Sequence, residues 1–340
     1  MQMSNKFYMG IDVSKAWFDI SLMVFSDHKK QPVQTARFDN TQEGIKALHR
    51  WLASNRVTFD DNSMVVIENT GVYHRLIWQY CSEHELPIHI GNAAHIKWSF
   101  GIARGKNDIV DSQRLCSYAF KHADELKATP VLNPIIIKLK DLFTARAKLI
   151  TQKNSIKIHL AELKGSNKKE IQRIMEKSYN AALKGIEQSI EDVETQIKIA
   201  IKEDEVIKKN HDLLCSVPGI GHIIAVYIIC CTANFAGNIS GKQLACYAGV
   251  VPFDNSSGSS IKGRKKVHKM ANKELKKLLH LSAITVVTHY PEFKEYYERK
   301  KAEGKHSLSV INAVKNKIAL RAVAVINKQE KYVSNSKNAA

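Results

Sequence analysis

The sequence lacks any long hydrophobic run. Its longest apolar stretch, Ile223 to Cys231, is far shorter than the roughly 20 residues that span a bilayer. Residues 1–6 also lack the basic and then apolar layout of a signal peptide. We therefore expect a protein without a membrane partner that stays in the cytoplasm.

Glycine and proline are scarce, with 16 and 7 among 340 residues, while hydrophobic residues make up 44%. This composition excludes a collagen and a disordered chain. Six cysteines occur without any C-x-x-C spacing, which favours buried, reduced thiols over disulfides or a zinc site. The length predicts a globular protein of two or three domains.

Acidic residues are outnumbered, because 51 Lys and Arg stand against 33 Asp and Glu and leave a net charge of +18. Residues 1–130 hold 15 basic and 14 acidic side chains, so residues 131–340 carry +17 of that excess. A surplus of a few lysines would merely solvate helices, but an excess of this size favours a polyanionic partner. The predicted partner is nucleic acid.

The first region alternates short apolar runs with helical periodicity. We predict strands within residues 7–25 and at 35–38, 64–67 and 87–90, and helices at 41–52, 72–84 and 107–120. Two of the strands are expected to join at a tight turn near Ser14. This order of elements is that of a ribonuclease-H-like α/β domain, assigned here to residues 1–130.

The pattern changes to long helices after a predicted linker between Pro130 and Pro134, so the overall class is α/β followed by α. Residues 135–205 predict a helical hairpin whose apolar positions from Leu183 to Ile197 have the spacing of a coiled coil. That seam fits packing within the chain and dimerisation equally well. We assign 131–208 to this coiled-coil region, 209–330 to a compact helical domain interrupted by a Gly/Ser-rich loop at 255–260, and 331–340 to a tail.

Four carboxylates lie at positions where an acidic side chain needs a physical reason, such as a core strand or a strand end. Asp12 lies inside an apolar strand, Glu68 ends another, and Asp108 and Asp111 share one helical face. Taken singly, each has a structural explanation: Asp12 as a turn residue, Glu68 as a cap of the next helix, and the other two as carboxylates in the first turn of a helix. Their joint occurrence predicts a site for Mg²⁺ or Mn²⁺, since hard cations prefer oxygen ligands.

Two further segments suggest contacts with nucleic acid. Ser216 to Gly221 has the pattern of a helix-hairpin-helix, in which Gly219 and Gly221 would let the backbone approach a phosphate; a plain turn between core helices is the alternative. Residues 262–277 carry eight Lys and Arg against one acid. The candidate phosphate-binding side chains in this run are Lys262, Arg264, Lys265, Lys266 and Lys269.

A serine cluster at residues 255–260 directly precedes the basic run. Alone it would be a solvated loop, but beside cations it could present a hydroxyl to a phosphodiester. No histidine or lysine base accompanies the serines in that cluster, so metal activation would be needed.

Five motifs in this order resemble the DEDD-type insertion-sequence transposases, which are bridge-RNA-guided serine recombinases related to the pilin-gene DNA invertase. The motifs are G-I-D-V-S-K at 10–15, I-E-N-T-G-V-Y at 67–73, K-N-D-I-V-D at 106–111, S-V-P-G-I-G at 216–221 and G-V-V-P-F-D-N-S-S-G-S-S-I-K-G at 249–263.

The resemblance implies a RuvC-like first domain in which Asp12, Glu68, Asp108 and Asp111 bind Mg²⁺. It further implies that the last domain supplies a nucleophilic serine, Ser257, which directly precedes the glycine of its motif; the neighbouring Ser256 leaves this open by one residue. The implied partners are donor and target double-stranded DNA, a non-coding bridge RNA, and further copies of the chain, as a dimer or tetramer in which serine and carboxylates meet between protomers.

Three functions are consistent with these residues. The leading one is a recombinase that cuts and rejoins DNA through a covalent phosphoserine. A hydrolytic RuvC-like endonuclease, such as a Holliday-junction resolvase, would use the same carboxylates with water as the nucleophile. A nucleic-acid-binding protein without catalysis would respond to Mg²⁺ only as to ionic strength.

Overall fold

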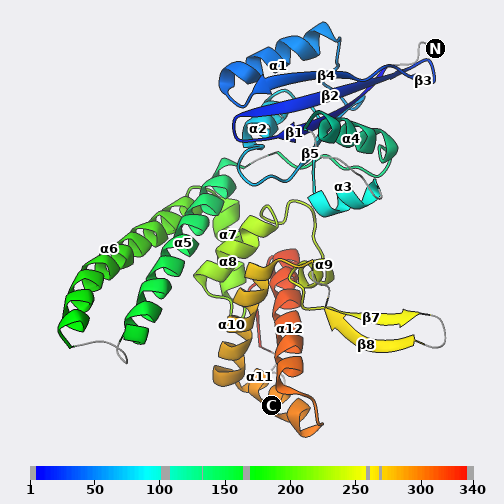
Figure 1. Cartoon of the computed structure of the whole chain (residues 1–340). Helices are drawn as coiled ribbons and strands as arrows, with labels where there is room; N and C mark the ends of the chain where they lie inside the picture. Colours follow the sequence, from blue (N-terminus) through cyan, green and yellow to red (C-terminus); the bar gives the residue numbers. More distant parts are fainter. Residues whose placement is uncertain are drawn as a thin grey trace. The chain divides into compact units, whose positions relative to one another are not determined.

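The computed structural model describes residues 5–100, 108–131, 133–163, 169–257, 261–267 and 270–334. The chain forms two compact units, residues 1–132 and 133–340 (Figure 1). Each unit is described by itself below.

The first unit is built on a mixed sheet, in which β1 pairs antiparallel with β2 and parallel with β5, and β5 pairs parallel with β6. The opposite edge of β2 pairs with β3 and β4. The strands are β1 (Lys6–Val13), β2 (Trp17–Ser26), β3 (Lys29–Lys30), β4 (Gln34–Asp39), β5 (Ser63–Glu68) and β6 (Ile88–Gly91).

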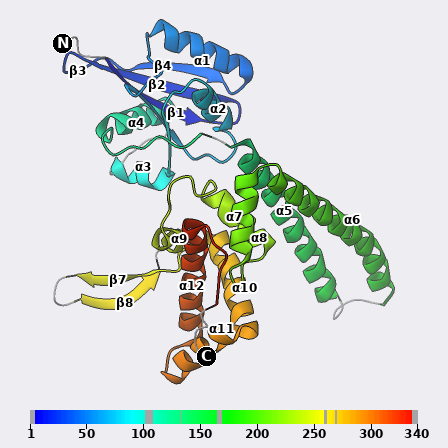
Figure 2. The ribbon, with the colours of Figure 1, turned by 180° about the vertical axis from the view of Figure 1, so that it is seen from behind.

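Helices cover both faces of this sheet. They are α1 (Gln42–Ser54), α2 (Arg75–Glu83), α3 (Ala93–Ser99) and α4 (Asp108–Lys121). Met9 and Ile11 share a hydrophobic cluster with residues of α1 and α2, while Tyr8 clusters with Ile96 of α3 and Leu115 of α4. Figures 1 and 2 show α1 and α4 on opposite sides of the strands. The alternation of side chains along β1 therefore feeds two separate cores.

The structure confirms the predicted strands and the three predicted helices of this unit, with differences at their ends. The helix expected from residue 72 begins at Arg75, because Gly71 adopts a left-handed φ of +76° in a turn that leaves Val72 and Tyr73 exposed. Helix α3 and the two-residue strand β3 are elements that the sequence patterns did not predict. The expected start of the last helix at residue 107 lies outside the described residues.

The second unit opens with two long helices, α5 (Pro134–Leu163) and α6 (Lys169–Lys202). Pro134 is the first residue of α5 rather than part of a linker, and the Asn133 side chain accepts a hydrogen bond from the Ile135 amide at 2.8 Å. Proline suits this position because the first helical N–H has no helical partner.

Ion pairs show that α5 and α6 run antiparallel. Lys138 pairs with Glu203 at 2.6 Å and Arg146 with Glu194 at 2.7 Å. Val193 and Ile197 of the predicted seam pack with Ile136 and Leu139 of α5. This part of the seam is thus used within the chain, and self-association through α6 stays a prediction.

The rest of the second unit is a helical core with a β-hairpin. Its elements are α7 (Glu205–Cys215), α8 (His222–Cys231), α9 (Gly241–Tyr247), β7 (Pro252–Ser257), β8 (Ile261–Val267), α10 (Lys273–His289), α11 (Pro291–Ala302) and α12 (Ser307–Lys328). The expectation of a Gly/Ser-rich loop at 255–260 was wrong for residues 255–257, which form the end of β7. Residues 258–260 lie outside the described part of the chain. Within that part, no helix is long and apolar enough to cross a membrane.

We expect Gly10→Ala to destabilise the first unit, because a Cβ there would lie 2.0 Å from the Cys116 amide nitrogen of α4. Moving backbone out of such a contact costs on the order of 1–3 kcal/mol or more. Thermal unfolding of the purified protein measures the effect. The matched control is Gly185→Ala in α6, where nothing lies within 4 Å of the added carbon and alanine should stabilise the helix by roughly 0.5–1 kcal/mol. Equal effects of the two substitutions would contradict this reading.

Candidate functional site

Strand pairing brings Asp12 and Glu68 together. Ile11 of β1 lies beside Ile67 of β5 in parallel register, so the next residue of each strand is a carboxylate at the same sheet edge. Asp12 follows Tyr8 and Gly10 on one face of β1, and Glu68 follows Val66 on the same face of β5, because strand side chains alternate. This is the face that α4 covers.

Helix α4 lies directly against β1 at Gly10, where a side chain would collide with the backbone of Ser112 and Cys116. Two further contacts hold it in place: Ser112 Oγ and Ser21 Oγ are 2.8 Å apart in a buried hydrogen bond, and Cys116 Sγ donates to the Tyr8 carbonyl at 3.2 Å. The N-terminal turn of α4, which carries Asp108 and Asp111, is therefore fixed beside the sheet edge.

One cavity of about 680 Å³ is lined by all four carboxylates that the sequence singled out. Its remaining walls come mainly from α3 and α4 and include Lys97, Phe100 and Arg114. The structure thus brings together Asp12, Glu68, Asp108 and Asp111, which come from two strands and one helix.

Mutual repulsion is visible in the acid–base properties of this cavity. Burial, followed by the charges of Asp111, Asp108, Glu68 and Asp19, raises the pKa of Asp12 to about 6. Burial and Asp111 also raise the pKa of Glu68, while Lys97 opposes that rise. A carboxyl with a raised pKa is destabilised in its charged form, so a bound cation would relieve it.

Sequence reasoning missed the basic side chains that balance these acids. Arg37 of β4 binds both carboxylate oxygens of the buried Asp19, at 3.0 and 2.9 Å, and its Nη2 lies 3.6 Å from Asp108. Arg114 pairs with Asp111 at 2.7 Å. The sequence could have pointed to Asp19, because the turn expected near Ser14 places it opposite Asp12 on the neighbouring strand.

These ion pairs bear on whether the residues fit a metal ion. Among the described residues, no three acidic, histidine or cysteine side chains already stand close enough to hold one. Asp108 and Asp111 each lie beside an arginine, whereas Asp12 pairs with no basic side chain among the described residues and has a raised pKa. Carboxylate oxygens are the donors that hard divalent cations prefer, so the set fits such an ion once the two arginine pairs open.

The helix-hairpin-helix prediction places its two glycines between α7 and α8. Gly219 has φ +85°, and a Cβ there would lie 2.5 Å from Val286 of α10, while its carbonyl accepts a hydrogen bond from Ser282. Gly219 therefore serves packing against α10. Gly221 is exposed at the N-cap of α8, with nothing within 4 Å of an added carbon.

The serine and lysine candidates lie on the β-hairpin. Ser256 is paired in register with Lys262, and Ser257 with Ile261. Arg264, Lys265 and Lys266 also belong to β8, next to an irregularity in the pairing between Phe253 and Asn255. Lys269 lies outside the described residues.

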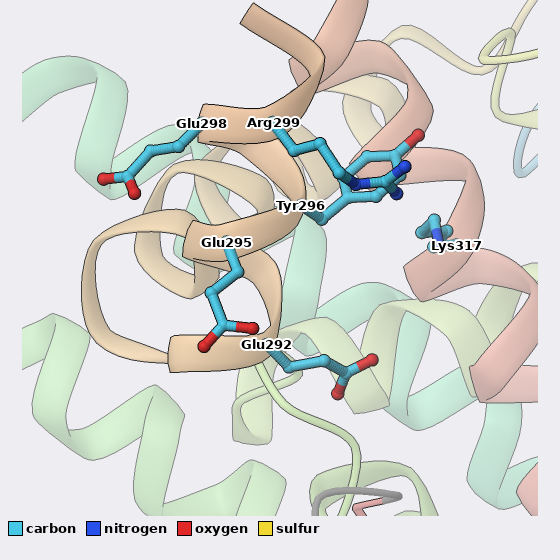
Figure 3. Close-up of a pocket in the computed structure, with 6 residues that line it drawn as sticks. All are labelled: Glu292, Glu295, Tyr296, Glu298, Arg299 and Lys317. Carbon is cyan, nitrogen blue, oxygen red and sulfur yellow. The ribbon is translucent and has the colours of Figure 1, made fainter. Parts of the chain in front are cut away.

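A second cavity with acidic residues differs from the carboxylate cavity, because its acids lie among basic side chains. It is lined by Glu292, Glu295, Tyr296, Glu298, Arg299 and Lys317 (Figure 3). Glu292 is already bound by Arg321 and by the Tyr332 hydroxyl, and the Lys317 ammonium lies 4.2 Å from the centre of the Tyr296 ring. Its acids, all on α11, lie among cations of α11 and α12, which is typical of an ion-paired surface rather than of a metal site.

Comparison with known proteins gives two matches to transposase families. Residues 9–163 match the DEDD model of IS110 elements, described as Transposase, and residues 211–298 match the model described as Transposase IS116/IS110/IS902 family.

Individual relatives agree with these matches. The pilin gene-inverting proteins of Moraxella bovis and Moraxella lacunata are each 26% identical over 96% of this chain and 98% of their own length. The insertion element IS110 uncharacterized 43.6 kDa protein of Streptomyces coelicolor is 30% identical over 32% of this chain and 27% of that protein. The matched segments include the carboxylate cavity of the first unit and, in the second, the residues from α7 into α11. The chain is therefore similar to transposases of the IS116/IS110/IS902 family, and these matches support a DNA transposase or recombinase.

Proposed function

We propose that this transposase cuts and rejoins DNA by using the four carboxylates of the first unit together with Ser257 of the second. The observation that carries the proposal is the convergence of Asp12, Glu68, Asp108 and Asp111 on one cavity. A RuvC-like fold for the first unit accords with its mixed sheet and with α4 packed against β1.

The proposed reaction is a transesterification on the serine. The Ser257 oxygen forms a bond to phosphorus, the bond from phosphorus to the 3′ oxygen breaks, and the serine proton passes to that 3′ oxygen. The DNA is left joined to the protein as a phosphoserine. The reverse step, with a 3′-hydroxyl of the recombined partner, restores the serine, so no nucleotide cofactor is needed.

Asp12, Glu68, Asp108 and Asp111 would hold Mg²⁺ or Mn²⁺. When bound, such an ion offsets charge that develops on the reacting phosphate and lowers the pKa of an attacking hydroxyl. Asp12 and Glu68, fixed on adjacent strands, would orient the site, while Arg37 and Arg114 would release the helix carboxylates for it. A hydrolytic RuvC-like endonuclease is the second candidate, because the carboxylate cavity lies wholly within the first unit.

The proposed partners are donor and target double-stranded DNA, a non-coding bridge RNA that selects them, and further copies of the chain. The net charge of +17 in residues 131–340 supports a nucleic-acid partner. The pilin gene-inverting relatives, named for an inversion of a gene, support a DNA rearrangement.

Ser257→Ala should abolish both the covalent DNA adduct and recombination, because it removes the attacking oxygen and leaves the carboxylate cavity intact. Incubation with end-labelled DNA followed by denaturing electrophoresis measures the adduct. Ser256→Ala is the matched control and should keep the adduct. Loss of the adduct in Ser256→Ala but not in Ser257→Ala would move the nucleophile by one residue, and wild-type cleavage without any adduct would favour hydrolysis.

Asp12→Asn should lower strand cleavage by more than about 100-fold, since several kcal/mol of charge stabilisation depend on the metal site. DNA binding should persist, because the positive charge lies beyond residue 130. Cleavage and gel-shift assays on the same preparations separate the two effects. Asp61→Asn, at an exposed position outside the cavity, is the control. Full cleavage by Asp12→Asn in Mg²⁺ would remove the metal site from the proposal.

Metal affinity should fall as the pH falls through the raised pKa of Asp12, because the proton competes with the cation. With a pKa of about 6, a simple competition makes the apparent Kd for Mn²⁺ about four-fold weaker at pH 5.5 than at pH 7.5. Titration calorimetry of the full-length protein measures this ratio. Asp12→Asn should bind more weakly at both pH values. Wild-type affinity that is equal at the two pH values would contradict the assignment of Asp12 as a ligand.

A further inference from the structure

Lys315 is a buried lysine without a partner. It lies on α12 between Val314 and Ile318 of the core, and the whole residue is only 7% exposed. Among the described residues, no acid pairs with it and no oxygen accepts a hydrogen bond from its ammonium group. Burial, and then the charge of Lys276, lower the pKa of Lys315.

Lys276 lies on α10, which packs against α12, and its charge has the same sign as that of Lys315. It too has neither an ion pair nor a side-chain hydrogen bond to any described residue. The neighbouring lysine on the same helix, Lys277, differs in being exposed and paired with Glu274 at 3.4 Å. Two helices that pack together thus carry two lysines whose charges repel, and neither lysine pairs with an acid among the described residues.

Both lysines lie where the β-hairpin leaves the helical core. Asn312, one turn before Lys315 on the same face of α12, donates to the Val250 carbonyl at 2.7 Å, two residues before β7 begins. Asn272, one turn before Lys276, caps α10 and donates its backbone N–H to the Tyr247 carbonyl at 2.8 Å. The hairpin itself projects from these helices (Figures 1 and 2).

Such an arrangement opposes folding. Burial of the Lys315 side chain removes part of the hydration of its ammonium group, and the positive charge of Lys276 disfavours the charged form further. Methionine has nearly the same shape as the lysine stem and would fill the same space. The charge of Lys315 therefore lowers the stability of the folded protein, and a bound anion would offset this loss.

We propose that Lys315 and Lys276 together bind one phosphate of the nucleic-acid backbone at the base of the β7–β8 hairpin. The inference rests on the proposed function, which makes DNA the anion. From Pro252 to Ser257 a strand advances about 3.4 Å per residue, or about 17 Å in all. The pair therefore holds a phosphate at a distance from the one that Ser257 attacks, and its role is to position the strand.

Lys315→Met tests this proposal through the unfolding temperature and the salt dependence of DNA binding. A purely structural role for Lys315 predicts a different result in each measurement. The variant should unfold at the same temperature as the wild type or a higher one, since a buried unpaired charge is gone. Its binding to a duplex of fixed sequence should weaken, and the slope of log K against log salt should fall by up to about 0.9, the value for one phosphate contact. Lys277→Met, one residue from Lys276 and exposed, should leave both measurements close to wild type.

A double-mutant cycle shows whether the two lysines share one phosphate. The loss of affinity in Lys276→Met/Lys315→Met should be smaller than the sum of the two single losses, because either substitution already removes part of the same contact. If the wild type binds DNA and Lys315→Met binds it with the same affinity and salt slope, the proposed phosphate site of the two lysines is wrong, while the proposed function still stands. A lower unfolding temperature with an unchanged slope would mark Lys315 as structural. Absence of DNA binding by the wild type would overturn the proposed function as well.

Discussion

The close approach of α4 to β1 is the constraint on which the candidate site depends. Only hydrogen fits at the Gly10 side-chain position, because the backbone of α4 occupies the space that a Cβ would need. The Ser21–Ser112 hydrogen bond and the Cys116 contact with Tyr8 then fix the helix along the strand. Because α4 cannot slide, its first turn delivers Asp108 and Asp111 to the edge where β1 and β5 deliver Asp12 and Glu68. A small residue in the middle of a strand thereby sets the geometry of four carboxylates.

The acids in this cavity are unequally compensated. Asp19 is buried and accepts two hydrogen bonds from Arg37, and Asp111 is paired with Arg114. Asp12 has no such partner in the described part of the chain, and burial, followed by the charges of the neighbouring acids, raises its pKa. The metal-free protein thus concentrates its electrostatic strain on one side chain in the middle of the group. A cation that binds there gains the most from Asp12, while the arginines limit repulsion until it arrives.

Much of the first unit could be predicted from the sequence, because its strands are short apolar runs whose alternation is visible in the letters. The four carboxylates could also be singled out, since each stands at a strand end or in a first helical turn. Arg37 could not, because its role depends on the pairing of β2 with β4, which brings residues 19 and 37 together. The strand at 252–257 was missed because its serines and asparagine are typical of loops; its pairing with β8 determines its structure. Lys315 was missed because a lysine within a helical apolar pattern gives no sign that, among the described residues, no acid pairs with it.

Each of the two units contains a buried ionisable side chain whose charged form is disfavoured, an acid in the first unit and a lysine in the second. In the first, burial among acids raises the pKa of Asp12, and in the second, burial beside Lys276 lowers the pKa of Lys315. Each group is held in surroundings that disfavour its ionised form, so each weakens the folded state at neutral pH, and a ligand of opposite charge would offset this loss. A protein that acts on DNA with a divalent cation would meet both ligands at once, since the phosphate backbone is the anion and the cation accompanies it. A bound cation and a bound phosphate would then each stabilise the protein, so that this part of the binding energy is gained in the complex with DNA rather than in the free protein.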